Sequence, residues 1–159
     1  RMHLHFTNIY INYRHGVFEY RSSSPDEEAL VKAARQASFF FKERKLNNVK
    51  LELPSGVTEE WIVLVTLEFS SERKRMSVLM KNVATEKMYL FTKGADDKIL
   101  PQLKPEHHDQ QINEHLELFA RQGLRTLCIA YREVSEAEYQ SWLPLYEKAS
   151  TALEDREVR

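Results

Sequence analysis

Cysteine is almost missing from the sequence, because Cys128 is the only one in 159 residues. A single thiol cannot form an internal disulfide, and a reducing compartment such as the cytosol fits the chain. Net charge is almost missing as well, since 23 lysine and arginine residues face 24 aspartate and glutamate residues, giving a formal charge of −1. No global field draws the chain to nucleic acid or acidic lipid, so any anion that it binds must be held by a local arrangement of groups.

Long hydrophobic runs are absent too. The longest, Trp61 to Val65, falls far short of the about 20 apolar residues that a membrane-spanning helix requires. The first residues, Arg1 to Tyr10, mix His, Thr and Asn with apolar residues, which is not the pattern of a signal peptide. The abrupt start and the charged end, Glu154 to Arg159, are those expected of a single module, residues 1–159, cut from a larger protein.

The standard phosphate-binding and metal-binding motifs are missing. There is no GxxxxGK[ST] or GxGxxG loop and no Cys/His cluster with zinc spacing. His107 and His108 are adjacent and would point in different directions on a helix, which favours a solvated helix start over a metal site. No nucleophile elbow is present, although a Ser/His/Asp set could still meet in space.

The clearest local signal is the stretch SSSPDEEALVKAARQA. Ser24 fits an N-cap, Pro25 the first helical position and Glu27 the third, which is a capping box. An apolar stripe then follows at Ala29, Leu30, Ala33, Ala34 and Ala37. The alternative is that Glu27 faces a pocket and accepts a hydrogen bond from an amino group of a ligand. The two interpretations compete, because a carboxylate turned to a ligand no longer caps the helix.

The remaining pattern predicts strands that are joined largely by hairpins, with the helices segregated from them along the chain. Strands are predicted at Val17–Arg21, Phe39–Phe41, Val49–Leu53, Glu60–Phe69, Met76–Met80, Lys87–Lys93 and Arg125–Val134. A helix with apolar residues Ile112, Leu116 and Phe119 is predicted over Glu106–Gln122, with Gly123 as its C-cap. We therefore expect an α+β fold with a mostly antiparallel, twisted sheet flanked by helices.

A second capping box, Ser135 with Glu138, opens the last predicted helix. Pro144 is expected to break or kink that helix near Leu143, because proline has no backbone N–H and its ring crowds the preceding turn.

Taken singly, the remaining features are ordinary. Phe69 at a strand end is typical of a core residue, and the cations Arg73, Lys74 and Arg75 are typical of a solvated hairpin edge. Lys93-Gly94 is a usual strand end. What matters is whether these features belong together.

Four stretches in series carry a family resemblance: SSSPDEEALVKAA, EFSSERKRMSV, LFTKGADDKIL and GLRTLCIAY. In this order and at these intervals they resemble the nucleotide-binding domain of P-type ATPases, and within them the type IV branch, the phospholipid flippases. The resemblance runs from about Phe18 to the end, where ASTALEDRE is similar to the exit toward the phosphorylation domain.

The resemblance implies a division of labour. Such a domain holds ATP, while a separate phosphorylation domain carries the aspartate that takes the γ-phosphate; that domain's DKTGT motif and the actuator motif DGET are both absent here. The resemblance therefore implies ATP binding in this chain, with Mg²⁺ in the intact enzyme, and no catalytic residue or metal ligand of its own. The intact protein would be an ATP-hydrolysing phospholipid translocase, with this domain in the cytosol at the cytoplasmic face of a membrane.

The resemblance also implies partners. They are ATP, the phosphorylation and actuator domains of the same ATPase, and an accessory subunit of the intact flippase as a further possibility. No nucleic acid is implied, and the isolated domain is expected to be a monomer.

Around the base, the resemblance assigns residues one by one. Phe69 matches the aromatic residue that stacks on adenine, and stacking on a ring is worth about 1–3 kcal/mol per base. Glu27 matches the acidic residue at the adenine edge, and Lys93 matches the lysine of the KGA motif near adenine and ribose. Gly94, with no side chain, would let backbone approach the ligand.

Around the phosphates, the resemblance assigns Arg125, whose planar fork suits phosphate oxygens, and Thr126 as a hydroxyl donor beside it. Ser71 and Lys74 match polar positions after the aromatic residue. Calcium-pump relatives carry an arginine where this chain has Ser71, which leaves fewer cations for the phosphates.

If the strand after the turn is regular, Lys74 shares a face with Met76, and the resemblance places that face on the ligand side. Arg73 and Arg75 would then point toward solvent or structural carboxylates. At Asp97-Lys98 the sequence departs from the commoner flippase motif, which has small or apolar residues there, and this difference puts no proposed ligand contact in doubt.

Two other classes of function stay open. A regulatory or interaction module could keep the fold and lose nucleotide binding. A nucleic-acid-binding domain could use the Arg73 to Arg75 patch, but the neutral net charge argues against it.

Overall fold

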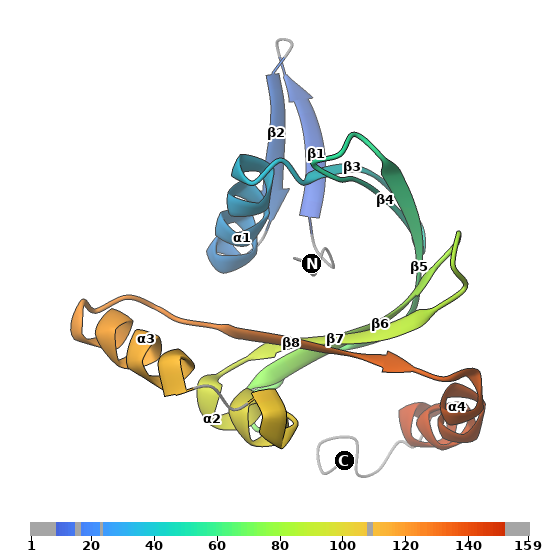
Figure 1. The fold of residues 1–159 in the computed structure, drawn as a ribbon. Helices are drawn as coiled ribbons and strands as arrows, with labels where there is room; N and C mark the ends of the chain where they lie inside the picture. The colour runs from blue at the N-terminus through green and yellow to red at the C-terminus, as the bar shows by residue number, and fades with distance from the viewer. Residues whose placement is uncertain (1–8, 15–16, 23, 108–109, 152–159) are drawn as a thin grey trace.

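The architecture is a curved antiparallel sheet with helices on both of its faces (Figure 1). The structure, a computed structural model, describes residues 9–14, 17–22, 24–107 and 110–151. Its strands are β1 Ile9–Arg14, β2 Val17–Ser22, β3 Phe40–Lys45, β4 Asn48–Glu52, β5 Thr58–Leu67, β6 Arg75–Asn82, β7 Met88–Gly94 and β8 Cys128–Val134. Its α-helices are α1 Pro25–Gln36, α2 Asp96–Ile99, α3 Gln110–Arg121 and α4 Glu136–Thr151, with 3₁₀ turns η1 Leu100–Gln102 and η2 Pro105–His107.

Strand order follows sequence order. Strands β3 to β8 form a six-stranded sheet in the order β3-β4-β5-β6-β7-β8, every pair is antiparallel, and β1 and β2 form a separate hairpin. The central strands are rich in the β-branched and large apolar residues that a sheet with two covered faces requires. The register shifts between Val63 and Val65 and between Phe41 and Glu43, and such bulges bend a strand. The predicted α+β fold with a mostly antiparallel sheet is confirmed.

The inner face of the curve packs against α1. Its core joins Val31 and Ala34 of α1 to Phe41, Trp61 and Phe91 of the sheet. Figure 1 shows α1 inside the curve of the sheet and α4 outside it.

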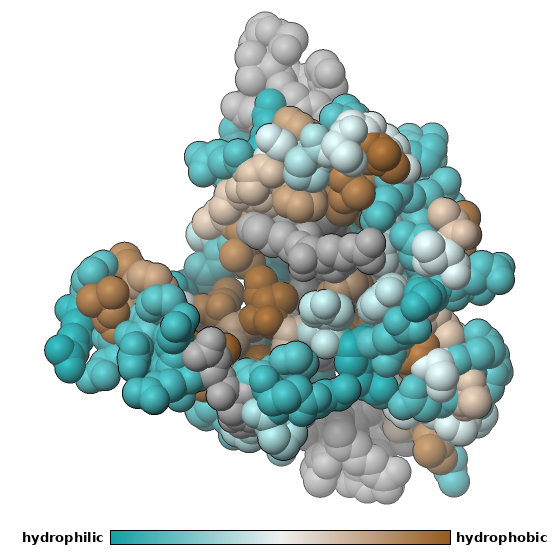
Figure 2. Space-filling view, in the orientation of Figure 1, coloured by the Kyte–Doolittle hydropathy of each residue, from teal (hydrophilic) through white to brown (hydrophobic). Residues whose placement is uncertain are grey.

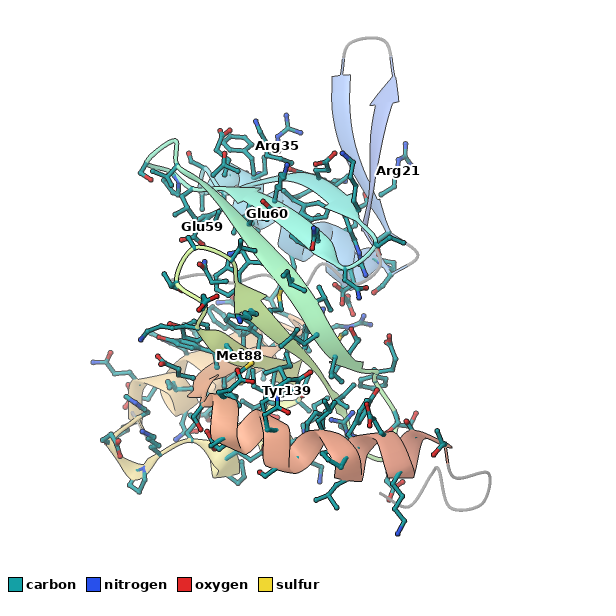
Figure 3. All side chains as sticks on the ribbon, turned by 90° about the vertical axis from the view of Figure 1, so that its right-hand side faces the viewer. Arg21, Arg35, Glu59, Glu60, Met88 and Tyr139 are labelled. Atoms are coloured by element: carbon teal, nitrogen blue, oxygen red, sulfur yellow. The ribbon has the colours of Figure 1, made fainter. Side chains whose placement is uncertain are left out.

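The outer face packs against α4. Val65, Leu79, Met88 and Val134 are buried there, with Tyr139 of α4 packed against them. The side-chain view shows Met88 and Tyr139 next to each other where α4 crosses the sheet (Figure 3).

Two helix predictions need correction. Helix α4 continues through Pro144 to Thr151, so the proline does not break it. The helix predicted over Glu106–Gln122 begins later, because Pro105–His107 form a 3₁₀ turn and α3 runs from Gln110 to Arg121. Gly123 follows it at φ +70°, as the predicted C-cap requires, and none of the residues of α3 is buried. The predicted start of that helix and the histidine pair lie partly outside the described residues, since His108 is not described. The ASTALEDRE exit lies mostly outside them too.

None of the helices in the described part of the chain is long and apolar enough to cross a membrane.

Candidate functional site

The candidate residues meet at one end of the sheet. Strand β5 ends at Leu67, β6 begins at Arg75, β7 ends at Gly94 and β8 begins at Cys128. The antiparallel register aligns these ends, because Arg75 pairs with Gly94 and Gly94 with Cys128. The predicted ligand residues lie on these strand ends, in the connections beside them, or in the first turn of α1.

Lys93, at the end of β7, is held by Glu27 of α1. Lys93 is only 6% exposed, and its Nζ donates to Glu27 Oε1. The other carboxylate oxygen, Glu27 Oε2, is buried and has no hydrogen-bond partner among the described residues. A buried carboxylate oxygen without a donor is unfavourable, so a donor from outside the described residues would stabilise it.

The capping box at α1 is therefore only half formed. Ser24 Oγ accepts a hydrogen bond from the backbone N–H of Glu27 at 3.5 Å, but the backbone N–H of Ser24 donates to Ser22 Oγ at 3.2 Å. The Glu27 carboxylate points to Lys93 on the sheet instead of back to the cap. Of the two interpretations of this stretch, the structure favours the carboxylate turned away from the helix.

Burial also shapes the charge of Lys93. Removal from water lowers the pKa of its amine to about 8, and the nearby carboxylate of Asp26 opposes this shift. The amine is charged at neutral pH and titrates in mildly alkaline solution.

Arg125 is held by the residue before Glu27. Its Nη1 donates to both carboxylate oxygens of Asp26, each at 2.9 Å. The Arg125 side chain is 77% exposed, so this ion pair is in water. The predicted strand from Arg125 is corrected, because β8 begins at Cys128 and leaves Arg125 and the half-buried Thr126 in the connection before it.

Phe69 lies in the turn that joins β5 to β6, and its ring is not in the core. The residue is 60% exposed. The turn is fixed by its own backbone: Lys74 N–H donates to Ser70 O at 2.8 Å, and Arg73 Nη1 donates to Glu68 O at 2.9 Å. Ser71 is exposed in the same turn. The core reading of Phe69 is therefore wrong.

Lys74 does not share a strand face with Met76. Strand β6 begins at Arg75, and Lys74 has a left-handed φ of +49°, so strand alternation does not extend to it. Met76 is buried, whereas Lys74 is exposed with its Nζ 3.6 Å from Asp97 Oδ2. Arg73 Nη1 donates to Glu68 O and Arg75 Nη1 donates to Arg73 O, so both side chains bind backbone carbonyls of the turn.

Gly94 makes room for the chain itself. A Cβ at this position would lie 2.5 Å from the carbonyl oxygen of Lys74 and 2.6 Å from Cβ of Arg75. The neighbouring Ala95 N–H donates to that same carbonyl at 3.1 Å. Gly94 thus brings the turn with Phe69 against the end of β7, and its contact with a ligand stays a prediction.

Sequence reasoning missed three neighbours of these residues. Asp26 was present in the SPDE stretch and Asp97 in KGADDKIL, but their partners are distant in sequence. Ile129 of β8 pairs directly with Lys93 in the register and is 44% exposed. The space-filling view shows hydrophobic surface between the part of the molecule with α1 and the part with α2 and α3 (Figure 2).

The arrangement suits an amphipathic anion with a planar group. It offers an exposed ring, an exposed aliphatic residue, a buried carboxylate oxygen that can accept a hydrogen bond, and cations at two depths. Within the described ranges, no group of three or more His, Cys, Asp and Glu residues could hold a metal ion.

Comparison with known proteins gives consistent matches. The family model described as "P-type ATPase, cytoplasmic domain N" matches residues 11–158. The chain is 42% identical over 141 residues to phospholipid-transporting ATPase dnf2 of Schizosaccharomyces pombe, which covers 87% of the chain and 10% of that protein. It is 40% identical over 144 residues to phospholipid-transporting ATPase 2 of Arabidopsis thaliana (91% of the chain, 13% of the relative). It is also 40% identical over 144 residues to phospholipid-transporting ATPase DRS2 of Saccharomyces cerevisiae (89% and 11%). The chain thus spans about a tenth of the length of these relatives.

Proposed function

The chain belongs to the cytoplasmic N domains of P-type ATPases, in the type IV, phospholipid-transporting branch, and from this premise we propose that it binds ATP. In the intact protein it presents the γ-phosphate to an aspartate of a separate phosphorylation domain. Phosphorylation of that aspartate drives movement of a phospholipid between the two leaflets of a membrane.

One observation carries the proposal: the buried oxygen of Glu27, beside Lys93, that has no hydrogen-bond partner in the described part of the chain. An exocyclic amino group, such as that of adenine, would donate to Glu27 Oε2 and remove the cost of leaving it unpaired. The chemistry of this acceptor supports an amino-bearing base over one that presents only carbonyl oxygens at this edge.

The other residues fit the remaining parts of the nucleotide. The exposed ring of Phe69 supplies a stacking surface for the base, and Lys93 supplies a fixed cation near base and ribose. Arg125 and Lys74 are exposed cations that can bind the phosphates of a nucleotide on the solvent side of the site. Ser71 and Thr126 add hydroxyl groups close to them in the sequence. Mg²⁺, which accompanies ATP in the intact enzyme, would neutralise part of the phosphate charge.

This function implies a setting for the module of residues 1–159. The domain works on the cytoplasmic face of a membrane, with the phosphorylation and actuator domains of the same chain as partners and an accessory subunit as a further candidate. We propose that the isolated domain is a monomer in the cytosol and does not bind nucleic acid.

The test is an ATP titration of the chain followed by NMR chemical shifts. Phe69→Ala should weaken ATP binding by about tenfold or more, because base stacking is worth about 1–3 kcal/mol. Lys93→Ala should remove the ATP-induced shifts. The matched control is Leu145→Ala, which removes an apolar side chain with 67% exposure from α4, on the outer face of the sheet.

Undiminished shifts in both Phe69→Ala and Lys93→Ala would contradict the assigned site. Absence of binding by the unmodified chain at millimolar ATP would favour the alternative, a regulatory or interaction module of the same fold.

A further inference from the structure

The two acidic residues that follow Pro25 hold two cations in different ways. Glu27 and Lys93 have side chains that are 12% and 7% exposed, so this pair is shielded from solvent. Asp26 and Arg125 have side chains that are 43% and 77% exposed, so this pair is open to water. An ion pair in water is weak, because solvent screens the attraction and side-chain entropy opposes it.

This difference has a chemical consequence for anion binding. If Lys93 left Glu27, the buried carboxylate of Glu27 would lose its cationic partner, which is costly. Arg125 can leave Asp26 at little cost, because both groups are already hydrated. Of these two cations, Arg125 is therefore the exchangeable one.

We propose that Asp26 competes with the phosphates of the nucleotide for Arg125 and so sets how strongly the site favours a highly charged ligand. This inference rests on the proposed function. In the ligand-free chain the carboxylate of Asp26 occupies Nη1 of Arg125 through both of its oxygens, each at 2.9 Å. Phosphate oxygens gain the full attraction of the guanidinium only when they replace that carboxylate.

The groups around Asp26 fit this role. Asp26 also faces Lys93, whose amine it stabilises in the charged form, but Lys93 already has the nearer carboxylate of Glu27. Removal of the Asp26 charge therefore leaves Lys93 paired and frees Arg125. Because the phosphates interact with Arg125 and the base does not, the effect should depend on the number of phosphates.

The experiment compares Asp26→Asn with Glu28→Gln by titration of the 159-residue chain with ATP and with adenosine. Glu28 is the matched control, since it is also in the first turn of α1 and pairs with Lys32 along the helix, at 2.5 Å. Both substitutions remove one negative charge from the same turn. Asp26→Asn should raise ATP affinity by about two- to fivefold, the range of an exposed ion pair, and leave adenosine affinity unchanged. Glu28→Gln should change neither affinity.

A double variant tests whether the gain in ATP affinity depends on Arg125. In a chain with Arg125→Gln, the further change Asp26→Asn should no longer raise ATP affinity, because no guanidinium remains to be released. An equal gain in that background, an equal gain from Glu28→Gln, or no gain from Asp26→Asn would overturn the inference while ATP binding stands. An unmodified chain that binds neither ATP nor adenosine would overturn the proposed function and this inference together.

Discussion

The chain contains the same helix-start pattern twice, and the two copies behave differently. At α4 the box closes: Glu138 N–H donates to Ser135 Oγ at 3.2 Å, and Ser135 N–H donates to Glu138 Oε2 at 2.9 Å. At α1 only the serine half forms, and the Glu27 carboxylate binds Lys93 instead. The local sequence favours capping in both places, so the difference comes from what lies opposite each helix.

The surroundings explain the choice. Glu138 is exposed, and its pKa is lowered first by the backbone N–H of Ser135 and then by Arg132. Its alternative to capping is solvent. Glu27 has a buried amine within reach, and leaving that amine unpaired would cost more than losing one cap hydrogen bond. A capping signal is thus overruled where a stronger partner is buried nearby.

Among the tests of the difference between the two helix starts, the substitution Glu27→Ala has the largest expected effect. We expect a loss of about 3 kcal/mol in the free energy of unfolding, because a buried cation loses its partner. Urea unfolding measures it, with Glu28→Ala as the control at an adjacent ion pair that is open to water and should cost much less. Equal losses in the two variants would show that Glu27 acts only as a residue of the helix start.

The next test uses pH. A bound phosphate group stabilises charged Lys93 and raises its pKa above the ligand-free value of about 8. This contribution to affinity is complete below pH 8 and is lost as pH rises through the higher pKa of the bound state. ATP affinity should therefore fall by up to about tenfold between pH 7 and pH 9. Isothermal titration calorimetry at several pH values measures it, and Lys93→Arg, whose guanidinium stays charged throughout this range, should flatten the dependence. A flat profile in the unmodified chain would exclude Lys93 as a cation that responds to the nucleotide.

The smallest test compares the two serines. Ser135→Ala should cost about 1 kcal/mol, the usual worth of an N-cap side chain. Ser24→Ala should cost less, because its cap contact is longer, at 3.5 Å against 3.2 Å. Thermal or urea unfolding of both variants decides the order, and a greater loss for Ser24→Ala would reverse our ranking of the two caps.

Local patterns were enough for most of the fold. The strands β4 to β7 were predicted within two residues at every end, because their apolar residues alternate or cluster and Pro54 and Gly56 mark the turn between β4 and β5. Strand β1 and the four-residue helix α2 were not predicted, and α2 is too short for periodicity to identify it.

Pro144 shows why tertiary packing can override a local rule. Trp142 precedes it and Tyr146 follows it, and both pack toward the outer face of the sheet. Packing on both sides of the proline holds the helix together despite the missing hydrogen bond.

The candidate site was predictable as a set of residues but not as a set of contacts. The resemblance supplied Glu27, Phe69, Lys93 and Arg125. Asp26 meets Arg125 across 99 residues and Glu27 meets Lys93 across 66, and no spacing rule reports such pairs. The left-handed backbone of Lys74 likewise depends on the turn and not on the pattern of the strand after it.

The strand order has a consequence for how the chain reaches this state. Because each strand of the large sheet pairs with its neighbour in sequence, most of its contacts are local, and low contact order favours rapid folding. The long connection between β7 and β8 is the exception, and closing it costs the most chain entropy in that sheet. Arg125 lies at the end of this connection, so its ion pair with Asp26 adds a contact that offsets part of the entropy cost of closing it.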